Sequence, residues 1–174
     1  MVADLLVDSF VIDATFLLAD AEKAFLGSVA IADECGRNTS VIYGAVRGLL
    51  QLRKALGIVS GIVVVGDDAN RVSSPQSIDM FCDLLRGIGS NVLHEPTVGV
   101  GLLLRSLHMD GKATWIVTGN KSLMQLVESG CGIVLTLEGS TPEVITENTL
   151  TSRYHITREQ VPSFIALTEV VGGP

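Results

Sequence analysis

The chain has 174 residues, the length of one ordinary domain with room for a buried core. Its 12 basic and 19 acidic side chains give a formal net charge of −7, which argues against a strong nucleic-acid binder, because phosphate neutralisation supplies most non-specific affinity. The apolar runs stop well before the ~18 residues that cross a bilayer, and Asp4 and Asp8 interrupt the N-terminal apolar stretch, so we expect neither a membrane span nor a signal peptide.

The first part of the chain alternates between strand and helix patterns. A first strand is predicted at Leu5–Ser9, and residues 10–26 have helical periodicity. Residues 28–38 are predicted to form a loop, after which a polar cap begins a helix over 41–56. The β-branched run GIVVVGDD, 61–68, is typical of a strand buried on both faces.

The same alternation continues to the end of the chain. Pro75 favours the first turn of a helix over 76–89. The later elements are predicted as a strand at 91–96, a helix at 99–111, a strand at 113–119, a helix at 120–130, a strand at 132–137 and short helices at 146–155 and 157–171.

Strands that alternate with helices imply β-α-β crossovers and a mostly parallel sheet covered on both faces. In such sheets the functional crevice lies beyond the carboxyl ends of the strands. The candidate site residues are therefore Asp8, Asp67, Asp68, and the residues in 97–102 and 118–122.

Five segments, in chain order, resemble motifs of the 5′-3′ exonuclease/flap endonuclease family, and most closely the N-terminal 5′-nuclease domain of bacterial DNA polymerase I. They are LLVDS, VIYGAVRGLLQL, IVVVGDD, VTGNKSLMQLV and RYHITREQVPSFIALT, and they extend from Leu5 to Thr168. The resemblance implies a three-layer, PIN-like α/β fold with a mostly parallel central sheet flanked by helices. It also implies a single domain over residues 1–174 that ends where the family's helix-hairpin-helix region begins.

The family cuts phosphodiester bonds with water activated by divalent cations, which several convergent carboxylates hold. On this chain the resemblance places the first acid at Asp8, with Asp13 on the following helix as the less favoured alternative. It places the second acid at Asp67, with Asp68 beside it. If Mg²⁺ or Mn²⁺ binds here, we expect the binding to be weak and residual.

The family's other acids are missing from this chain. Its third cluster falls on PTVGVGLLL, where Gly99, Gly101 and Leu102 occupy the acidic positions and make a more apolar helix suited to a buried face. Its fourth cluster has Asn120 and Ser122 in place of two acids. Neither side chain neutralises a divalent charge. The sequence therefore predicts a degenerate 5′-nuclease domain that is catalytically weak or inactive.

Weak, non-specific contacts with DNA are expected at Arg47, Thr118 and Lys121, although solvated lysine and arginine side chains are the simpler interpretation. Similarly, Asp8 and Asp67 could cap the helices that follow them. Tyr43 is expected in the core rather than as a platform for base stacking.

Two other functions remain open: a working divalent-metal 5′-3′ exonuclease that uses Asp8 and Asp67, and a structural protein-interaction module. The apolar composition, 47% of residues, suits contact with another copy of the chain or with a further helix-hairpin-helix or polymerase region. Cys35, Cys82 and Cys131 lack metal-ligand spacing and are predicted to be reduced thiols of a cytoplasmic protein.

Overall fold

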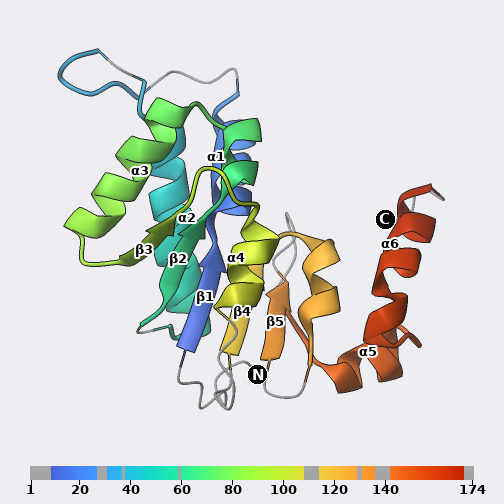
Figure 1. The fold of residues 1–174 in the computed structure, drawn as a ribbon. Coiled ribbons are helices and arrows are strands. Elements are labelled where there is room, and N and C mark those ends of the chain that lie inside the picture. The colour runs from blue at the N-terminus through green and yellow to red at the C-terminus, as the bar shows by residue number, and fades with distance from the viewer. Residues whose placement is uncertain are drawn as a thin grey trace.

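A computed structural model gives the fold (Figure 1). It describes residues 9–26, 31–36, 38–58, 60–107, 114–128, 131–135 and 142–170. Asp8 and most of the first predicted strand therefore lie outside the described residues. In the described part no helix is long and apolar enough to span a membrane.

The centre of the fold is a six-stranded sheet in the order β3-β2-β1-β4-β5-β6. Its first five strands pair in parallel, and β6 is antiparallel to β5. The strands are β1 Ser9–Asp13, β2 Ile62–Val65, β3 Asn91–His94, β4 Thr114–Thr118, β5 Cys131–Leu135 and β6 Glu143–Ile145. The carboxyl ends of β2, β1 and β4 are thus neighbours at one edge of the sheet.

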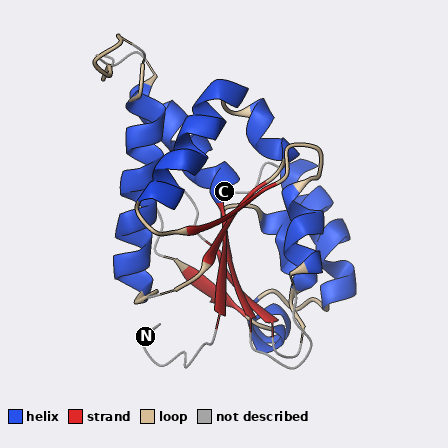
Figure 2. Cartoon of the chain, turned by 60° about the vertical axis from the view of Figure 1, so that its left-hand side comes forward, coloured by secondary structure: helices blue, strands red, loops and turns tan. Residues whose placement is uncertain are grey.

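Helices lie on both sides of the sheet (Figure 2). The helices are α1 Ala14–Phe25, α2 Ser40–Leu56, α3 Pro75–Gly87, α4 Val100–Ser106, α5 Glu147–Arg153 and α6 Val161–Val170, with short 3-10 helices η2 Asp67–Arg71, η3 Lys121–Leu126 and η4 Arg158–Gln160.

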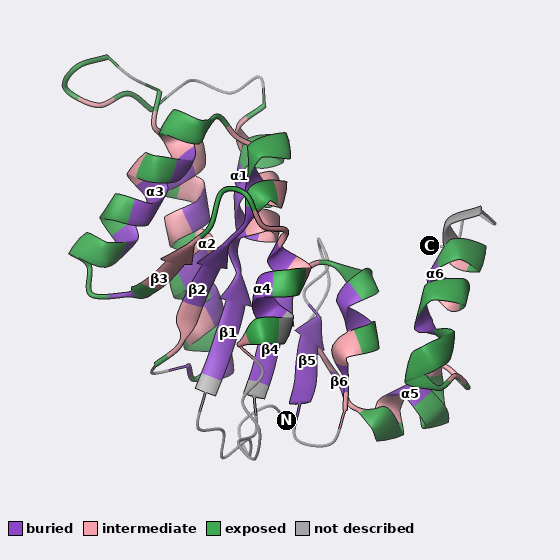
Figure 3. Ribbon diagram, viewed as in Figure 1, coloured by how far each residue is buried: buried purple, intermediate pink, exposed green. Residues whose placement is uncertain are grey.

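Alternation along the strands separates two hydrophobic cores. Ile12 and Val63 pack with the apolar sides of α1, α2 and α3, whereas Val11 and Val64 pack with α4, η3, α5 and α6. Successive side chains of a strand point to opposite faces, so strands buried on both faces are apolar at every position. Figure 3 shows β1, β2, β4 and β5 as mostly buried, whereas β3 is mostly of intermediate exposure. The predicted three-layer α/β fold is confirmed.

Two helix predictions were wrong at their boundaries. The helix predicted over 10–26 begins only at Ala14, because β1 pairs with β2 through Asp13 and with β4 through Ile12. The helix predicted over 120–130 is the shorter η3, since the chain is extended again from Val127. The antiparallel strand β6 was not predicted.

Candidate site at the carboxyl ends of the strands

Asp13 is the carboxylate at the end of β1 and is 1% exposed. One of its oxygens, Oδ1, accepts a hydrogen bond of 2.8 Å from the Thr15 amide as the cap of α1. The other, Oδ2, accepts one of 2.8 Å from the Thr118 hydroxyl at the end of β4. Burial raises the pKa of Asp13 above its ordinary value, the hydrogen bonds from Thr118 and Thr15 oppose the increase, and the charge of Asp68 adds to it. Both oxygens of Asp13 thus tie elements of the fold together.

Thr118 and Asn120 continue this network along the chain. The Asn120 amide donates to Thr118 Oγ1 at 3.0 Å. The Asn120 side-chain oxygen accepts from the Ser122 amide at 2.9 Å and caps η3. Lys121, at the first position of η3, is exposed. The structure therefore gives Thr118 and Asn120 structural hydrogen bonds at the strand ends, and it leaves Lys121 open to solvent.

The two acids after β2 differ in their surroundings. Asp68 Oδ2 accepts a hydrogen bond of 2.8 Å from the Val100 amide at the start of α4. Asp67 is exposed, and its Oδ1 accepts from the Asn70 amide group at 3.2 Å. Both acids follow Gly66, where a Cβ would lie only 2.6 Å from the Val100 nitrogen and 2.7 Å from the Val98 oxygen. Close backbone contact at Gly66 therefore holds the end of β2 against the start of α4.

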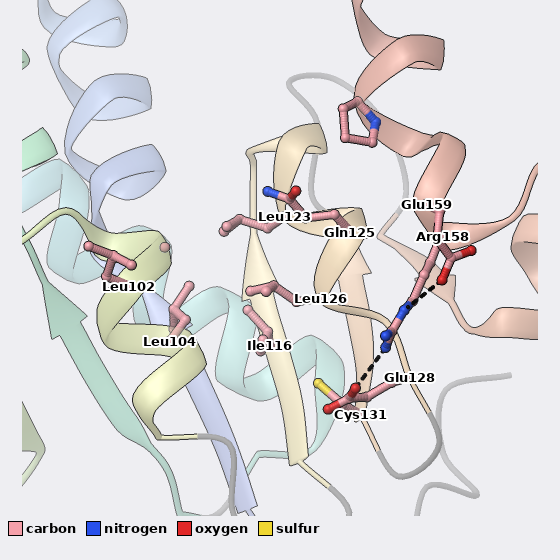
Figure 4. Close-up of a pocket in the computed structure, with 12 residues that line it drawn as sticks. Leu102, Leu104, Ile116, Leu123, Gln125, Leu126, Glu128, Cys131, Arg158 and Glu159 are labelled. Carbon is pink, nitrogen blue, oxygen red and sulfur yellow. Dashed lines mark hydrogen bonds and ion pairs between the residues drawn. The ribbon is translucent and has the colours of Figure 1, made fainter.

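Gly99 and Gly101, at the positions of the family's third acidic cluster, lie in different surroundings. A Cβ on Gly99 would lie 3.4 Å from Asp68 Oδ2, whereas one on Gly101 would lie 3.4 Å from Leu123 Cδ2 on η3. Leu102 is 68% exposed, so the buried face expected for this helix is wrong at that position. Gly101 and Leu102 line a pocket between α4 and η3 (Figure 4).

Helix α2 carries the remaining candidate contact, Arg47. Its sequence, SVIYGAVRGLLQLRKAL, contains three basic residues and no acid. Arg47 and Lys54 are exposed, and Tyr43 is 50% exposed, so the prediction that Tyr43 is a core residue was wrong. Since α2 ends just before β2 begins, its first half, with Tyr43 and Arg47, lies toward the carboxyl ends of the strands.

A pair of divalent cations needs several oxygen ligands that converge and are not otherwise engaged. Within the described ranges, no three His, Cys, Asp or Glu side chains gather in a way that could hold a metal ion. Asp13 is buried and accepts two hydrogen bonds, and Asp68 accepts one from the first amide of α4. Asp67 and Glu95 are exposed. The described residues do not fit a metal pair, and Asp8 lies outside them.

The structure adds Asp13 to the centre of the candidate site. It brings Asp13 together with Thr118 and places Asp68 close enough to affect its pKa. The available signal was the pattern FVID followed by ATFLL, in which an acid ends an apolar run and caps a helix.

No family model matches the chain, and no curated protein matches it. Solved structures do. The catalytic core of Rad2 in complex with DNA substrate superposes with a TM-score of 0.57 at 17% identity, over 91% of this chain and 53% of that one. A mutant T5 5′-exonuclease gives 0.54 at 10% identity, over 92% and 61% of the two chains. A flap endonuclease of bacteriophage T5, in a pseudo-enzyme–product complex with DNA and metal ions, gives 0.53 at 10% identity, over 94% and 66%. The chain therefore has the PIN-like α/β fold of flap endonucleases and 5′-3′ exonucleases, and it spans about half to two thirds of the length of the chains in these structures.

Proposed function

We propose that the chain is a degenerate 5′-3′ exonuclease/flap endonuclease-like domain with little or no catalytic activity and a residual role in binding nucleic acid or a partner. The observation that carries the proposal is the use of the strand-end acids. Asp13 links α1 to β4, and Asp68 caps α4. Both oxygens of Asp13 and one oxygen of Asp68 are engaged in this way, which makes them less available to a cation.

The neutral residues around these acids support the same proposal. The side-chain oxygen of Asn120 accepts a hydrogen bond that caps η3, and Gly99 has no side chain that could bind a cation. Asp67, after β2, and Glu95, after β3, are exposed carboxylates among the described acids at the strand ends. No third described acid converges with them, and ligands this few leave Mg²⁺ coordinated mainly by water, which does not fix two cations for in-line attack on a phosphodiester. In this proposal residues 1–174 act as one domain.

We expect no cleavage of flap or nicked DNA above a protein-free control in Mg²⁺ or Mn²⁺. The reason is that, among the described residues, no three His, Cys, Asp or Glu side chains gather as a metal pair requires. End-labelled substrates resolved on denaturing gels, with wild type and Asp67→Ala in parallel, measure this. Cleavage abolished by Asp67→Ala or by Asp8→Ala would contradict the proposal and favour the active metal-dependent exonuclease.

Residual nucleic-acid binding is proposed to involve the exposed face of α2. Arg47 and Lys54 can contact phosphates, and Tyr43, one turn before Arg47 on α2, offers an exposed aromatic ring. The net charge of −7 opposes such binding by the domain as a whole. The result should be weak affinity that depends on salt.

We expect a labelled single-stranded or flap DNA to bind no more tightly than the non-specific range of about 10⁻⁴–10⁻⁶ M, and to bind more weakly as salt rises. Arg47→Glu should reduce this binding more than Arg86→Glu, which makes the same charge change on α3, where Arg86 already pairs with Asp83. Fluorescence anisotropy across a salt series measures both effects. Equal losses in the two variants would mean that general charge, and not the α2 face, determines the binding.

A further inference from the structure

An apolar strip runs from the core to the surface between α2 and α3, which contact each other on the same side of the sheet (Figure 1). Val46 of α2 and Met80 of α3 are partly buried and pack against the core that both helices share. One turn further along each helix, Leu50 and Leu84 are 51% and 44% exposed, and Ile88, at the end of α3, is 50% exposed. Residues four apart lie on the same side of a helix, so we call these five residues the α2–α3 strip.

The neighbours of α2 show which way its part of the strip is turned. A Cβ on Gly44 would lie 2.7 Å from the Phe25 ring and 2.9 Å from Ala21 Cβ, so this side of α2 meets α1. Each residue turns a helix by about 100°, so Val46 lies about 200° around the helix from Gly44. Val46 and Leu50 therefore face away from α1 and toward α3.

The neighbours of α3 place its part of the strip on the side of α2. The carboxylate of Asp79 on α3 lies 3.8 Å from Nδ1 of His94, on the edge strand β3. Leu84 follows five residues later and is turned about 140° around the helix from Asp79. Since β3 is the outermost strand on this side of the sheet, Leu84 and Ile88 are turned away from the edge and toward α2.

The α2 side of the strip is basic. α2 contains Arg47, Arg53 and Lys54 and no acid, and none of the three makes an ion pair with another described residue. Arg53 lies seven residues after Val46, on the side of the strip, and its Nε is buried without a hydrogen-bond partner in the described part of the chain. Arg53 as a whole is partly exposed, so an acceptor on a partner can reach its guanidinium. These cations favour a partner with carboxylates.

Acids on the neighbouring helices do not pair with these cations. Asp83 of α3 pairs with Arg86 at 3.1 Å, and Asp79 is turned toward β3. Asp20 and Glu22 belong to α1, on the other side of α2 from the strip. The junction between α2 and α3 therefore combines exposed apolar side chains with positive charge.

We propose that the α2–α3 strip binds an amphipathic helix of a partner protein, with leucine-like side chains on one face and glutamate or aspartate beside them. The proposal rests on the partner-binding role proposed above and gives that role a surface. Such helices dock through anchors at positions i, i+3, i+4 and i+7, and their carboxylates would meet Arg47, Arg53 and Lys54. Nucleic acid would meet the cations but leave the leucines in water, and two copies joined by the same patch would bring their cations together.

The test uses a fluorescein-labelled helical peptide with leucine at those four positions and glutamate beside them, titrated with the whole chain. We expect it to bind wild type, and we expect Leu84→Gln to weaken binding about tenfold or more, as loss of a central apolar anchor does. The matched control is Leu167→Gln, because Leu167 is 66% exposed on α6, a helix that packs with the other core. It should change affinity less than about twofold. Both leucines are exposed, so thermal melts should show that both variants remain folded.

Charge is tested with a second pair of variants. Arg53→Gln should weaken the leucine–glutamate peptide several-fold. Arg86→Gln removes the same charge from α3, two residues and thus about 200° from Leu84, and should have little effect. A peptide with lysine in place of glutamate should bind wild type poorly. Equal losses within either pair of variants, equal binding of the two peptides, or no detectable binding up to about 100 μM peptide would overturn the proposal.

Two further measurements separate the strip from other occupants. Leu84→Gln should leave the DNA affinity unchanged, whereas Arg47→Glu should lower it, so a failure of peptide binding is distinguishable from a failure of nucleic-acid binding. Equal loss of DNA and peptide binding in Leu84→Gln would overturn the proposal, because the strip would then belong to a nucleic-acid surface. Self-association in sedimentation velocity that Leu84→Gln abolishes would also overturn it, because the strip would then receive a second copy of the chain.

Discussion

Gly66→Ala is expected to lower the free energy of unfolding by about 2–3 kcal/mol, at the upper end of the effects of overpacking. The new Cβ would lie 2.6 Å from the Val100 nitrogen and 2.7 Å from the Val98 oxygen. Both are backbone atoms and cannot turn aside as a flexible side chain can. The loop before α4 must therefore move, which strains the bond from the Val100 amide to Asp68. Urea denaturation followed by circular dichroism measures the loss.

Gly101→Ala is the matched control for this substitution. Its Cβ would lie 3.4 Å from Leu123 Cδ2, which is the end of a side chain and not a backbone atom. Alanine is also favoured over glycine within a helix by up to about 1 kcal/mol. Gly101→Ala should therefore be neutral or slightly stabilising. If Gly66→Ala were equally well tolerated, the approach of α4 to the end of β2 would be looser than the described contacts require.

The alternation of strands and helices was enough to predict the layers of the fold, but it could not place the first strand. LLVD, 5–8, and FVID, 10–13, have the same pattern of three apolar residues and an acid. The described strand ends at Asp13, whose partner Thr118 lies 105 residues further along the chain. Contacts at that separation leave no periodic signal in a short segment. The choice between Asp8 and Asp13 was therefore open from local sequence alone.

The outer surfaces were predicted less well, for related reasons. Tyr43 lies outside the buried stripe of α2, which is formed by Ile42, Ala45, Leu49, Leu52 and Leu56, so the helix turns it toward solvent. The ion pair between Arg158 and Glu128 joins segments 30 residues apart in the chain. Such long-range pairs follow from how elements pack, which a local sequence pattern does not show.

Asp13→Asn is expected to gain stability relative to wild type as pH rises above the ordinary carboxyl range. Burial raises the pKa of Asp13 in the folded state, so the folded protein favours the protonated acid. At low pH, both the folded and the unfolded chain hold the proton, and asparagine resembles the protonated acid in shape and hydrogen bonding. As pH rises past the unfolded pKa, the unfolded chain loses its proton first. Wild type then loses stability, by up to about 1.4 kcal/mol per pH unit, until the folded pKa is passed.

Urea denaturation of both proteins between about pH 4 and pH 8 measures this difference, because all other titrating groups are shared and cancel. Asp67→Asn, at an exposed position, controls for the loss of one carboxylate. The Asp13→Asn variant should match wild type at the acid end and be the more stable protein at neutral pH. Millimolar Mg²⁺ should leave this relation unchanged if Asp13 serves the fold through Thr15 and Thr118. A reversal in Mg²⁺, with wild type becoming the more stable protein, would mean that a cation ionises Asp13, and the strand ends would then hold a metal after all.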